Sequence, residues 1–189
     1  MRVTGGILRG RKIFCPSGQL VRPTTDKVRY ALFQIISSNF FYDLEGLFVV
    51  DLFAGTGALG IEALSRGAKR CVFVDNSPVA IRCLKKNLQN LGLISKADVV
   101  KKDVYRYLTS KSIDSYSFDL IFCDPPYEKG HLQRLVDLFE KKAFLLSDRG
   151  ILIIEERKRV DLDEGLLKRL ELILVKRYGD TKLFFLRKR

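Results

Sequence analysis

The sequence predicts an α/β fold in which a mostly parallel sheet ends in an antiparallel hairpin. From residue 47 to residue 155, apolar segments of strand length alternate with segments whose apolar residues recur at helical spacing. Such alternation is typical of a parallel sheet covered on both faces by helices. The last two apolar segments, 170–176 and 182–186, are joined by only five residues. A link this short requires antiparallel pairing, because a parallel crossover needs about a dozen residues or more.

The individual elements follow in order along the chain. Residues 2–14 predict two short strands around a glycine-containing turn, a β-hairpin, and Thr24-Thr25-Asp26 predicts the start of a helix. These form an N-terminal extension, residues 1–40, of a single domain, 1–189, whose core is 41–189. In the core, strands are expected at 47–52, 71–74, 97–101, 118–123 and 150–155, and helices at 58–66, 78–91 and 131–145. With the terminal hairpin, these make a seven-stranded sheet.

The chain is basic, and its positive charge is concentrated near its start. Among 189 residues, 34 are Lys or Arg and 22 are Asp or Glu, which gives a formal net charge of +12. The first 29 residues hold seven cations and a single acid, Asp26. Phosphate groups would offset this charge and release counterions, so a nucleic acid is the expected partner. A solvated basic surface is the alternative.

The composition argues against several classes of protein. No apolar run reaches the ~18 residues of a membrane span. The N-terminus lacks the apolar core of a signal peptide, so a cytoplasmic protein is expected. The four cysteines are scattered without CxxC spacing and there is one histidine, so no metal site is predicted. That histidine, His131, is expected to have a surface or capping role rather than to act as a base.

A glycine-rich loop follows the first strand of the core. The segment Asp51-Leu-Phe-Ala-Gly55-Thr-Gly57-Ala-Leu-Gly60 comes directly after an apolar strand and opens a helix. Glycines permit a tight turn here and the close approach of a ligand to the backbone. The GxGxxG spacing by itself also fits a dinucleotide site.

Acidic residues at the strand ends favour S-adenosylmethionine over a dinucleotide. Asp51 would repel a pyrophosphate but suits the ammonium group of a methionine moiety. Asp75 ends the next strand, where a carboxylate accepts hydrogen bonds from both ribose hydroxyl groups. Asp103 follows the third strand, beside the expected adenine. Helix capping by Asp51, and solvated loop positions for the other two acids, are the alternatives. The predicted cofactor-binding set is Asp51, Phe53, Gly55, Gly57, Asp75, Asn76, Asp103 and Val104.

A second motif, Asp124-Pro125-Pro126-Tyr127, follows the strand 118–123. The prolines fix an extended backbone without N–H donors, which leaves the Asp124 carboxylate and the Pro125 carbonyl as acceptors. Two acceptors that hold the hydrogens of an exocyclic amino group direct its lone pair at an activated methyl group. Tyr127 offers a ring on which a planar base stacks. The predicted catalytic set is Asp124, Pro125 and Tyr127, and a capped proline turn is the alternative.

With these motifs the chain resembles the bacterial 16S rRNA (guanine(966)-N(2))-methyltransferases, the small-subunit rRNA methyltransferase D group. The resemblance rests on MRVTGGILRGRKI, RPTTDKVRYALFQII, VVDLFAGTGALGIEALSRGA, DLIFCDPPY and RYGDTKLFF, from residue 1 to about residue 186. The glycine loop and Asp-Pro-Pro-Tyr are shared by many methyltransferases, whereas Arg22-Pro-Thr-Thr-Asp26 and the basic hairpin are specific. One departure is Tyr30, where the family often has Glu.

The resemblance implies a class I (Rossmann-like) fold, S-adenosylmethionine as methyl donor and a 16S rRNA guanine N2 as acceptor. It also implies that a cytoplasmic monomer acts on the small ribosomal subunit or an assembly intermediate, with its N-terminal segment on RNA. The predicted RNA-binding set is Arg2, Arg9, Arg11, Lys12, Arg22, Thr25, Lys27 and Arg29.

Other functions remain open at this point. One is a methyltransferase of another amine, such as DNA adenine or protein glutamine, although glutamine-modifying relatives usually carry Asn at position 124. An NAD-dependent oxidoreductase would explain GxGxxG and leave Asp-Pro-Pro-Tyr without a purpose. A non-catalytic RNA-binding module would leave the acids Asp51, Asp75 and Asp124 unexplained.

Overall fold

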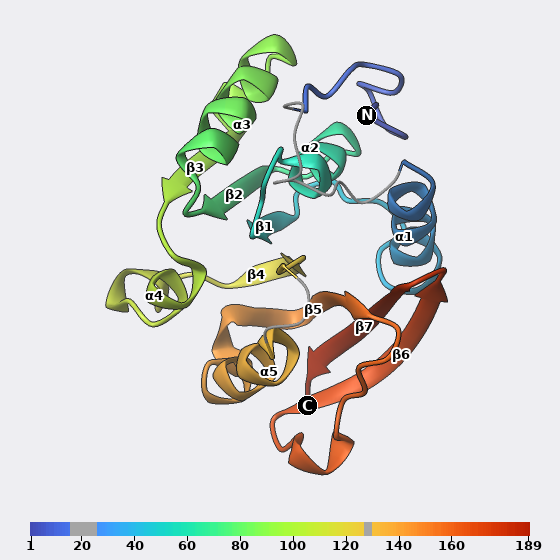
Figure 1. Ribbon diagram of the computed structural model, residues 1–189, viewed down its shortest axis with the longest axis vertical. Coiled ribbons are helices and arrows are strands. Elements are labelled where there is room, and N and C mark those ends of the chain that lie inside the picture. Colours follow the sequence, from blue (N-terminus) through green and yellow to red (C-terminus); the bar gives the residue numbers. More distant parts are fainter. Residues whose placement is uncertain (16–25, 127–129) are drawn as a thin grey trace. The chain divides into compact units, whose positions relative to one another are not determined.

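A computed structural model describes residues 1–15, 26–126 and 130–189 of the chain. They form two compact units, Met1–Val104 and Tyr105–Arg189, coloured blue to green and green to red in Figure 1. The predicted single domain with a boundary at residue 40 stays a prediction. Within the described residues, no helix is long and apolar enough to cross a membrane.

The first unit is built on three parallel strands in the order β3-β2-β1. They are β1 (Phe48–Leu52), β2 (Arg70–Asp75) and β3 (Ala97–Lys101), linked by helices α2 (Ala58–Ser65) and α3 (Pro78–Asn90). Both crossovers step in the same direction along the sheet, so right-handed connections place α2 and α3 on the same face, as Figure 1 shows. Every residue of α2 is buried, which explains its mostly apolar sequence; the two polar exceptions are Glu62 and Ser65.

The N-terminal segment, defined here as residues 1–15, lies against α2 and α3 of this unit (Figure 1). It turns back on itself as predicted, but the two expected strands do not form. Arg2 and Lys12 make an isolated antiparallel bridge. A few more backbone hydrogen bonds join the two arms, such as Ile13 N–H to the Met1 carbonyl at 3.0 Å. Turns occupy 5–10, where the Ile7 N–H donates to the Ser65 carbonyl of α2 at 2.8 Å instead of to a strand partner. Helix α1 (Asp26–Asn39) follows and buries Leu32, Phe33, Ile35 and Ile36.

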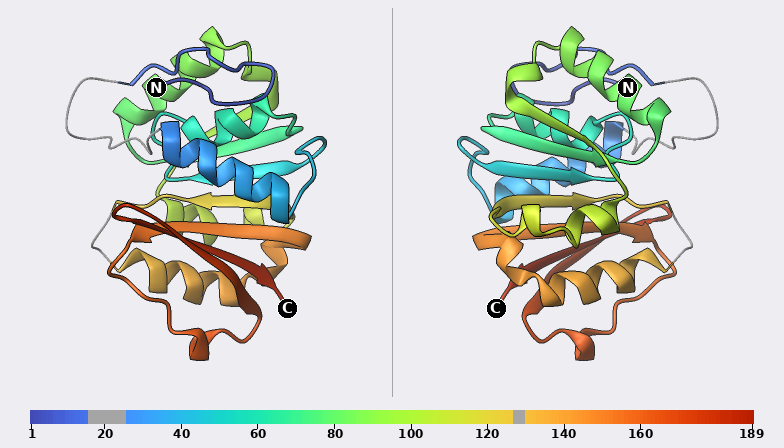
Figure 2. Two further views of the ribbon diagram at one scale, coloured as in Figure 1. Left: turned by 90° about the vertical axis from the view of Figure 1, so that its right-hand side faces the viewer. Right: turned by 90° about the vertical axis from the view of Figure 1, so that its left-hand side faces the viewer.

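The second unit contains four strands in the order β4-β5-β7-β6. β4 pairs parallel with β5, whereas β5–β7 and β6–β7 are antiparallel. The helix α5 joins β4 to β5, and Figure 2 shows it beside these strands. The elements of this unit are α4 (Val104–Leu108, of which all but Val104 belongs here), β4 (Phe118–Cys123), α5 (His131–Lys141), β5 (Leu146–Arg157), β6 (Leu170–Tyr178) and β7 (Thr181–Lys188).

Most predicted elements occur, and their boundaries differ where packing extends or interrupts a local pattern. The strands 97–101 and 118–123 end where expected. The predicted helix 131–145 stops at Lys141, and the 3-10 turn Ala143–Leu145 follows. Strand β5 begins at Leu146 rather than at 150, since its polar start, Ser147 to Arg149, hides the strand pattern. The five-residue helix α4 was not predicted, and a segment this short carries little periodicity.

Candidate active site

The glycine loop after β1 makes a tight turn that holds three residues, Phe53, Gly55 and Gly57, in the left-handed region. Phe53 has a φ of 62°, and it is the one described residue other than glycine with positive φ. Gly57, at the N-terminus of α2, has a φ of 83°, and a Cβ there would lie 2.3 Å from the side chain of Leu84. A Cβ on Gly60 would lie 2.3 Å from Phe73. Gly57 and Gly60 therefore allow α2 to pack closely on its neighbours, in addition to turning the chain.

Asp75 joins the three loops that follow the strands of the first unit. Its Oδ2 accepts from the Gly55 N–H at 2.8 Å, and its Oδ1 accepts from the Ser77 N–H at 2.8 Å. Its carbonyl accepts from the N–H of Lys102 at 3.1 Å. The half-buried carboxylate thus fixes the glycine loop to the end of β2. Because each carboxylate oxygen has a second lone pair, Asp75 keeps the capacity to accept from a ligand.

Asp51 is buried and caps the first turn of α2. Its Oδ2 accepts from the Gly60 N–H at 2.9 Å, which is the capping role considered above as the alternative. Burial raises the pKa of Asp51 to about 8; the nearby Asp75 adds to this, and the Gly60 hydrogen bond opposes it. A cation next to this carboxyl would favour its charged form. The remaining members of the predicted cofactor set follow β2 and β3: Asn76 is exposed, Asp103 is half-buried and Val104 is buried.

The acceptor motif lies in the second unit, directly after β4. Asp124 is half-buried, Pro125 is buried and Pro126 is exposed. The strand that carries them is buried from Leu120 to Cys123, so the start of the turn is held by the core. Tyr127, predicted to stack on the base, lies outside the described residues.

His131 has a different environment from the surface or capping position expected. It is the first residue of α5, where Gly130 is the N-cap. Its Nδ1 lies 2.6 Å from the Tyr105 hydroxyl, and the two rings stack with centroids 5.8 Å apart. The Arg134 guanidinium lies 3.6 Å from the Tyr105 ring centroid. His131 therefore ties α5 to α4 within the second unit.

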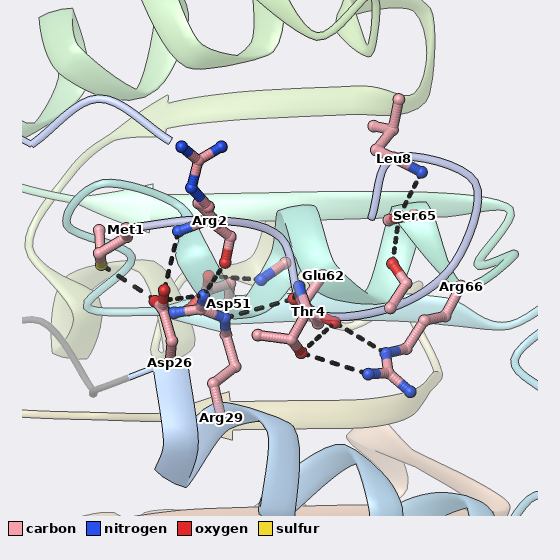
Figure 3. Close-up of polar contacts among 12 residues, drawn as sticks. Met1, Arg2, Thr4, Leu8, Asp26, Arg29, Asp51, Glu62, Ser65 and Arg66 are labelled. Carbon is pink, nitrogen blue, oxygen red and sulfur yellow. Dashed lines mark hydrogen bonds and ion pairs between the residues drawn. The ribbon is translucent and has the colours of Figure 1, made fainter. Parts of the chain in front are cut away.

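The N-terminal segment is anchored to the first unit through Glu62 of α2, which is fully buried (Figure 3). Oε2 of Glu62 accepts from the Thr4 N–H at 2.8 Å, and Oε1 accepts from the Thr4 hydroxyl at 2.7 Å. The same carboxylate pairs with Arg29 at 3.3 Å and with Arg66 at 2.9 Å. One buried carboxylate thus connects the segment, α1 and α2.

The predicted RNA-binding residues divide into exposed and internal groups. Arg29 is fully buried: it pairs with Asp26 at 2.9 Å and with Glu62, and it donates to the Arg2 carbonyl. A phosphate cannot reach a guanidinium enclosed in this way, so the prediction that Arg29 contacts RNA is corrected. Arg22 and Thr25 lie outside the described residues. The exposed members are Arg2, Arg9, Arg11, Lys12 and Lys27.

Sequence reasoning missed two buried polar residues that organise this region. Glu62 is the one charged residue of the buried helix α2, and that isolated charge was the available signal. Asn87 lies on the buried face of α3 and binds the backbone of Phe14. Its helical spacing from Ala80 and Leu84 places it on the apolar face of α3, but a neutral amide there is a weaker signal than an isolated charge.

A glycine loop closed on a strand-end carboxylate, an Asp-Pro-Pro turn after β4 and a mostly parallel set of strands ending in an antiparallel hairpin define a class I methyltransferase fold. Over residues 1–187, the chain matches the protein family described as "Conserved hypothetical protein 95". The chain belongs to this family, and the resemblance to the small-subunit rRNA methyltransferase D group is confirmed by its relatives.

Three relatives illustrate the match. The "Putative rRNA methyltransferase YlbH" of Bacillus subtilis is 40% identical over 164 residues, covering 87% of this chain and 86% of that protein. The "Ribosomal RNA small subunit methyltransferase D" of Escherichia coli K12 is 35% identical over 155 residues, covering 82% of this chain and 74% of that protein. The solved structure "Putative methyltransferase yhhF from Escherichia coli" superposes with a TM-score of 0.83 at 30% identity, covering 100% of this chain and 98% of that one.

Proposed function

We propose that this protein transfers a methyl group from S-adenosylmethionine to the exocyclic N2 of a guanine in 16S rRNA. The observation that carries the proposal is the loop system joined by Asp75, in a chain that matches rRNA methyltransferases over most of its length. The acceptor is rRNA of the small subunit or of an assembly intermediate, and the enzyme acts as a cytoplasmic monomer.

The donor is assigned to the first unit. S-adenosylmethionine supplies an electrophilic methyl group on a sulfonium centre. Asp75, fixed by the Gly55 and Ser77 N–H groups, accepts from the ribose hydroxyls. Asp51 already uses Oδ2 for the Gly60 N–H, so its Oδ1 is assigned to the methionine ammonium group. A tightly turned loop with a carboxylate at the adjacent strand end fits S-adenosylmethionine. This molecule has ribose hydroxyls that donate to the carboxylate, and it has no negatively charged phosphate that the carboxylate would repel.

The acceptor is assigned to the second unit. Asp124 and the Pro125 carbonyl accept the two hydrogens of the guanine amino group and direct its lone pair toward the methyl carbon. Positioning of this kind contributes several kcal/mol, with about 7–11 kcal/mol as the limit for ideal geometry. Tyr127 stacks on the base, which enters the site from a single strand or after leaving its stack.

The decisive experiment measures transfer of a labelled methyl group to small-subunit rRNA and to partly assembled subunits, followed by nucleoside analysis. N2-methylguanosine is the expected product. Label in another nucleoside would show that a different base is methylated, and label in DNA or protein alone would reject rRNA as the substrate. Calorimetry with S-adenosylmethionine and NAD tests the cofactor separately, and tight NAD binding without a response to S-adenosylmethionine would overturn its assignment.

The variant Asp124→Ala tests the assigned acceptor role separately from the assigned donor role. Methyl transfer should be lost while S-adenosylmethionine affinity stays close to that of the wild type, because the carboxylate acts on the acceptor amine during the reaction. Asp124→Asn should retain more activity, since an amide oxygen still accepts one hydrogen. As the matched donor variant, Asp75→Ala should instead weaken cofactor binding, with each lost charge-assisted hydrogen bond costing about 1.5–3 kcal/mol. Wild-type turnover by Asp124→Ala would disprove the assigned role.

A further inference from the structure

We infer that Phe14 is the stacking platform of a nucleotide subsite, which takes one unpaired base of a single-stranded RNA segment together with its phosphate. This inference rests on the proposed RNA substrate and adds a contact outside the Asp-Pro-Pro-Tyr motif. The subsite lies within the first unit, on the N-terminal segment.

The backbone of Phe14 is fixed on both sides by one buried amide. Oδ1 of Asn87 accepts from the Phe14 N–H at 2.8 Å, and Nδ2 of Asn87 donates to the Phe14 carbonyl at 2.9 Å. The same Nδ2 donates to the Thr56 carbonyl of the glycine loop at 3.0 Å, and the Cys83 thiol lies 3.2 Å from the Phe14 carbonyl. A residue held in this way presents its side chain with little loss of entropy on binding, because its backbone is already ordered.

The side chain, in contrast to its backbone, is open to solvent. Phe14 is 48% exposed, although Ile13 beside it is buried at 3%. Exposure of a phenyl ring costs hydrophobic free energy, because its apolar surface stays in contact with water. The exposed ring on an ordered backbone is therefore available to a ligand.

One cation lies over this ring, and others line the adjoining cavity. The ammonium group of Lys86 on α3 lies 4.7 Å from the ring centroid. Arg2 and Lys12 line the adjoining cavity, and Arg11 donates to the Asn90 carbonyl at its edge at 3.1 Å. The one acid in the lining is Asp26, whose carboxylate oxygens are used by Arg29 and by the Arg2 N–H. An aromatic ring among cations is the arrangement that binds a base through stacking and its backbone through charge.

The adjoining space has the size of a nucleotide site. The cavity measures about 580 Å³ and is lined by Arg2, Lys12, Phe14, Asp26 and Asn90 among others. Small-molecule sites span about 300–1,000 Å³. An apolar peptide would gain from Phe14 but would leave these cations without a counter-charge, whereas a ribonucleotide satisfies the ring and the cations together.

The test uses a short single-stranded oligouridylate with one 2-aminopurine, which stacks little on its uracil neighbours in the free strand and whose fluorescence falls when the base stacks on a ring. Phe14→Leu keeps an apolar side chain of similar size and removes the aromatic face. RNA affinity should fall by about 5- to 150-fold, equivalent to about 1–3 kcal/mol, and the quenching should be lost. Phe14→Tyr should restore both. With rRNA as substrate, KM for RNA should rise while kcat and S-adenosylmethionine affinity stay unchanged.

Tyr42→Leu is the matched control, because Tyr42 is 97% exposed and lies beside Asp43 in the same unit. If Phe14→Leu binds and quenches like Tyr42→Leu while the wild type methylates rRNA, the subsite is wrong and the proposed function stands. Failure of the wild type to bind or methylate RNA overturns both.

Discussion

The N-terminal segment and the β6–β7 hairpin (Leu170–Lys188) are both rich in cations, but their cations have different partners. In the hairpin, Arg187 pairs with Glu171, Lys188 with Asp148 at 2.6 Å and Lys182 with Asp161 at 2.6 Å. Near the chain start, the acids Asp26 and Glu62 are taken by Arg29 and Arg66. Arg9 and Lys12 are exposed, and the described part of the chain places no acid within ion-pair distance of either.

The difference shows that a count of basic residues does not locate a nucleic-acid surface. Charges already paired with acids gain less from a phosphate, because the existing pair must be broken or shared. The partly exposed Asp26 and the buried Glu62 both pair with the internal Arg29, and this leaves the outer cations Arg9 and Lys12 available. The N-terminal segment is therefore favoured over the hairpin as the RNA surface, and the predictions below compare the two regions by stability, salt dependence and pH dependence.

The largest expected effect comes from Glu62→Ala. Removing this carboxylate leaves Arg29 buried with a charge that is only partly compensated and frees Thr4 from α2. Breaking a buried pair by removing one partner costs about 3–5 kcal/mol. Denaturant unfolding measures the loss, and hydrogen exchange should show faster exchange at the Thr4 and Leu8 amides. Wild-type stability together with unchanged exchange would show that the segment is held by other contacts.

The second effect concerns RNA affinity. Replacing Arg9, Arg11 and Lys12 together by Ala should weaken RNA binding on the order of 100-fold near physiological salt, and each lost phosphate contact should lower the salt slope by about 0.9. The matched triple variant replaces Arg187, Lys188 and Arg189 in the C-terminal region. It should change the slope less, since two of these cations pair internally. Measurements of affinity across a salt series decide between the surfaces, and equal slopes would remove the contrast.

The third effect is a pH dependence with opposite signs in the two regions. Burial raises the pKa of Asp51 to about 8, so its stabilisation is complete below the ordinary pKa of 3.8 and is lost as pH rises toward 8. This proton contributes at most about 1.4 kcal/mol for each pH unit. Lys182 lowers the pKa of Asp161 through a hydrogen bond and its charge, so that contribution is lost as pH falls. The free energy of unfolding of Asp51→Asn, measured across pH, should fall less than that of the wild type as pH rises toward 8. A pH profile identical to that of the wild type would argue against the Asp51 contribution.

The smallest effect is expected from Glu171→Gln, the surface counterpart of the Glu62 change. Glu171 is partly exposed and Arg187 is more than half exposed. Exposed pairs contribute about 0–1 kcal/mol because water and salt screen them. Denaturant unfolding should therefore place this variant close to the wild type. A loss comparable with that of Glu62→Ala would mean that burial is not what separates the two networks.

The sequence predicted the alternation of strands and helices and the positions of the glycine loop and the Asp-Pro-Pro turn, because these depend on local patterns. Hydrophobic periodicity, chain reversal at glycine and the rigidity of proline act over a few residues, so they can be recognised before the fold is known. For the same reason the two short N-terminal strands were overestimated: their pattern was local, while the backbone of Ile7 found its partner in Ser65 of α2.

The sequence by itself determined the class of fold, the family and the residues at the strand ends. Only the tertiary structure decided which of the basic residues are available. Glu62 and Thr4 are 58 positions apart, and Glu62 and Arg29 are 33 positions apart. No local sequence pattern links residues at these separations. Burial then fixes the outcome, since a charge removed from water must find a partner at whatever sequence distance the fold supplies one. Arg29 became an internal anchor by this rule, and Phe14 became an exposed ring on a clamped backbone.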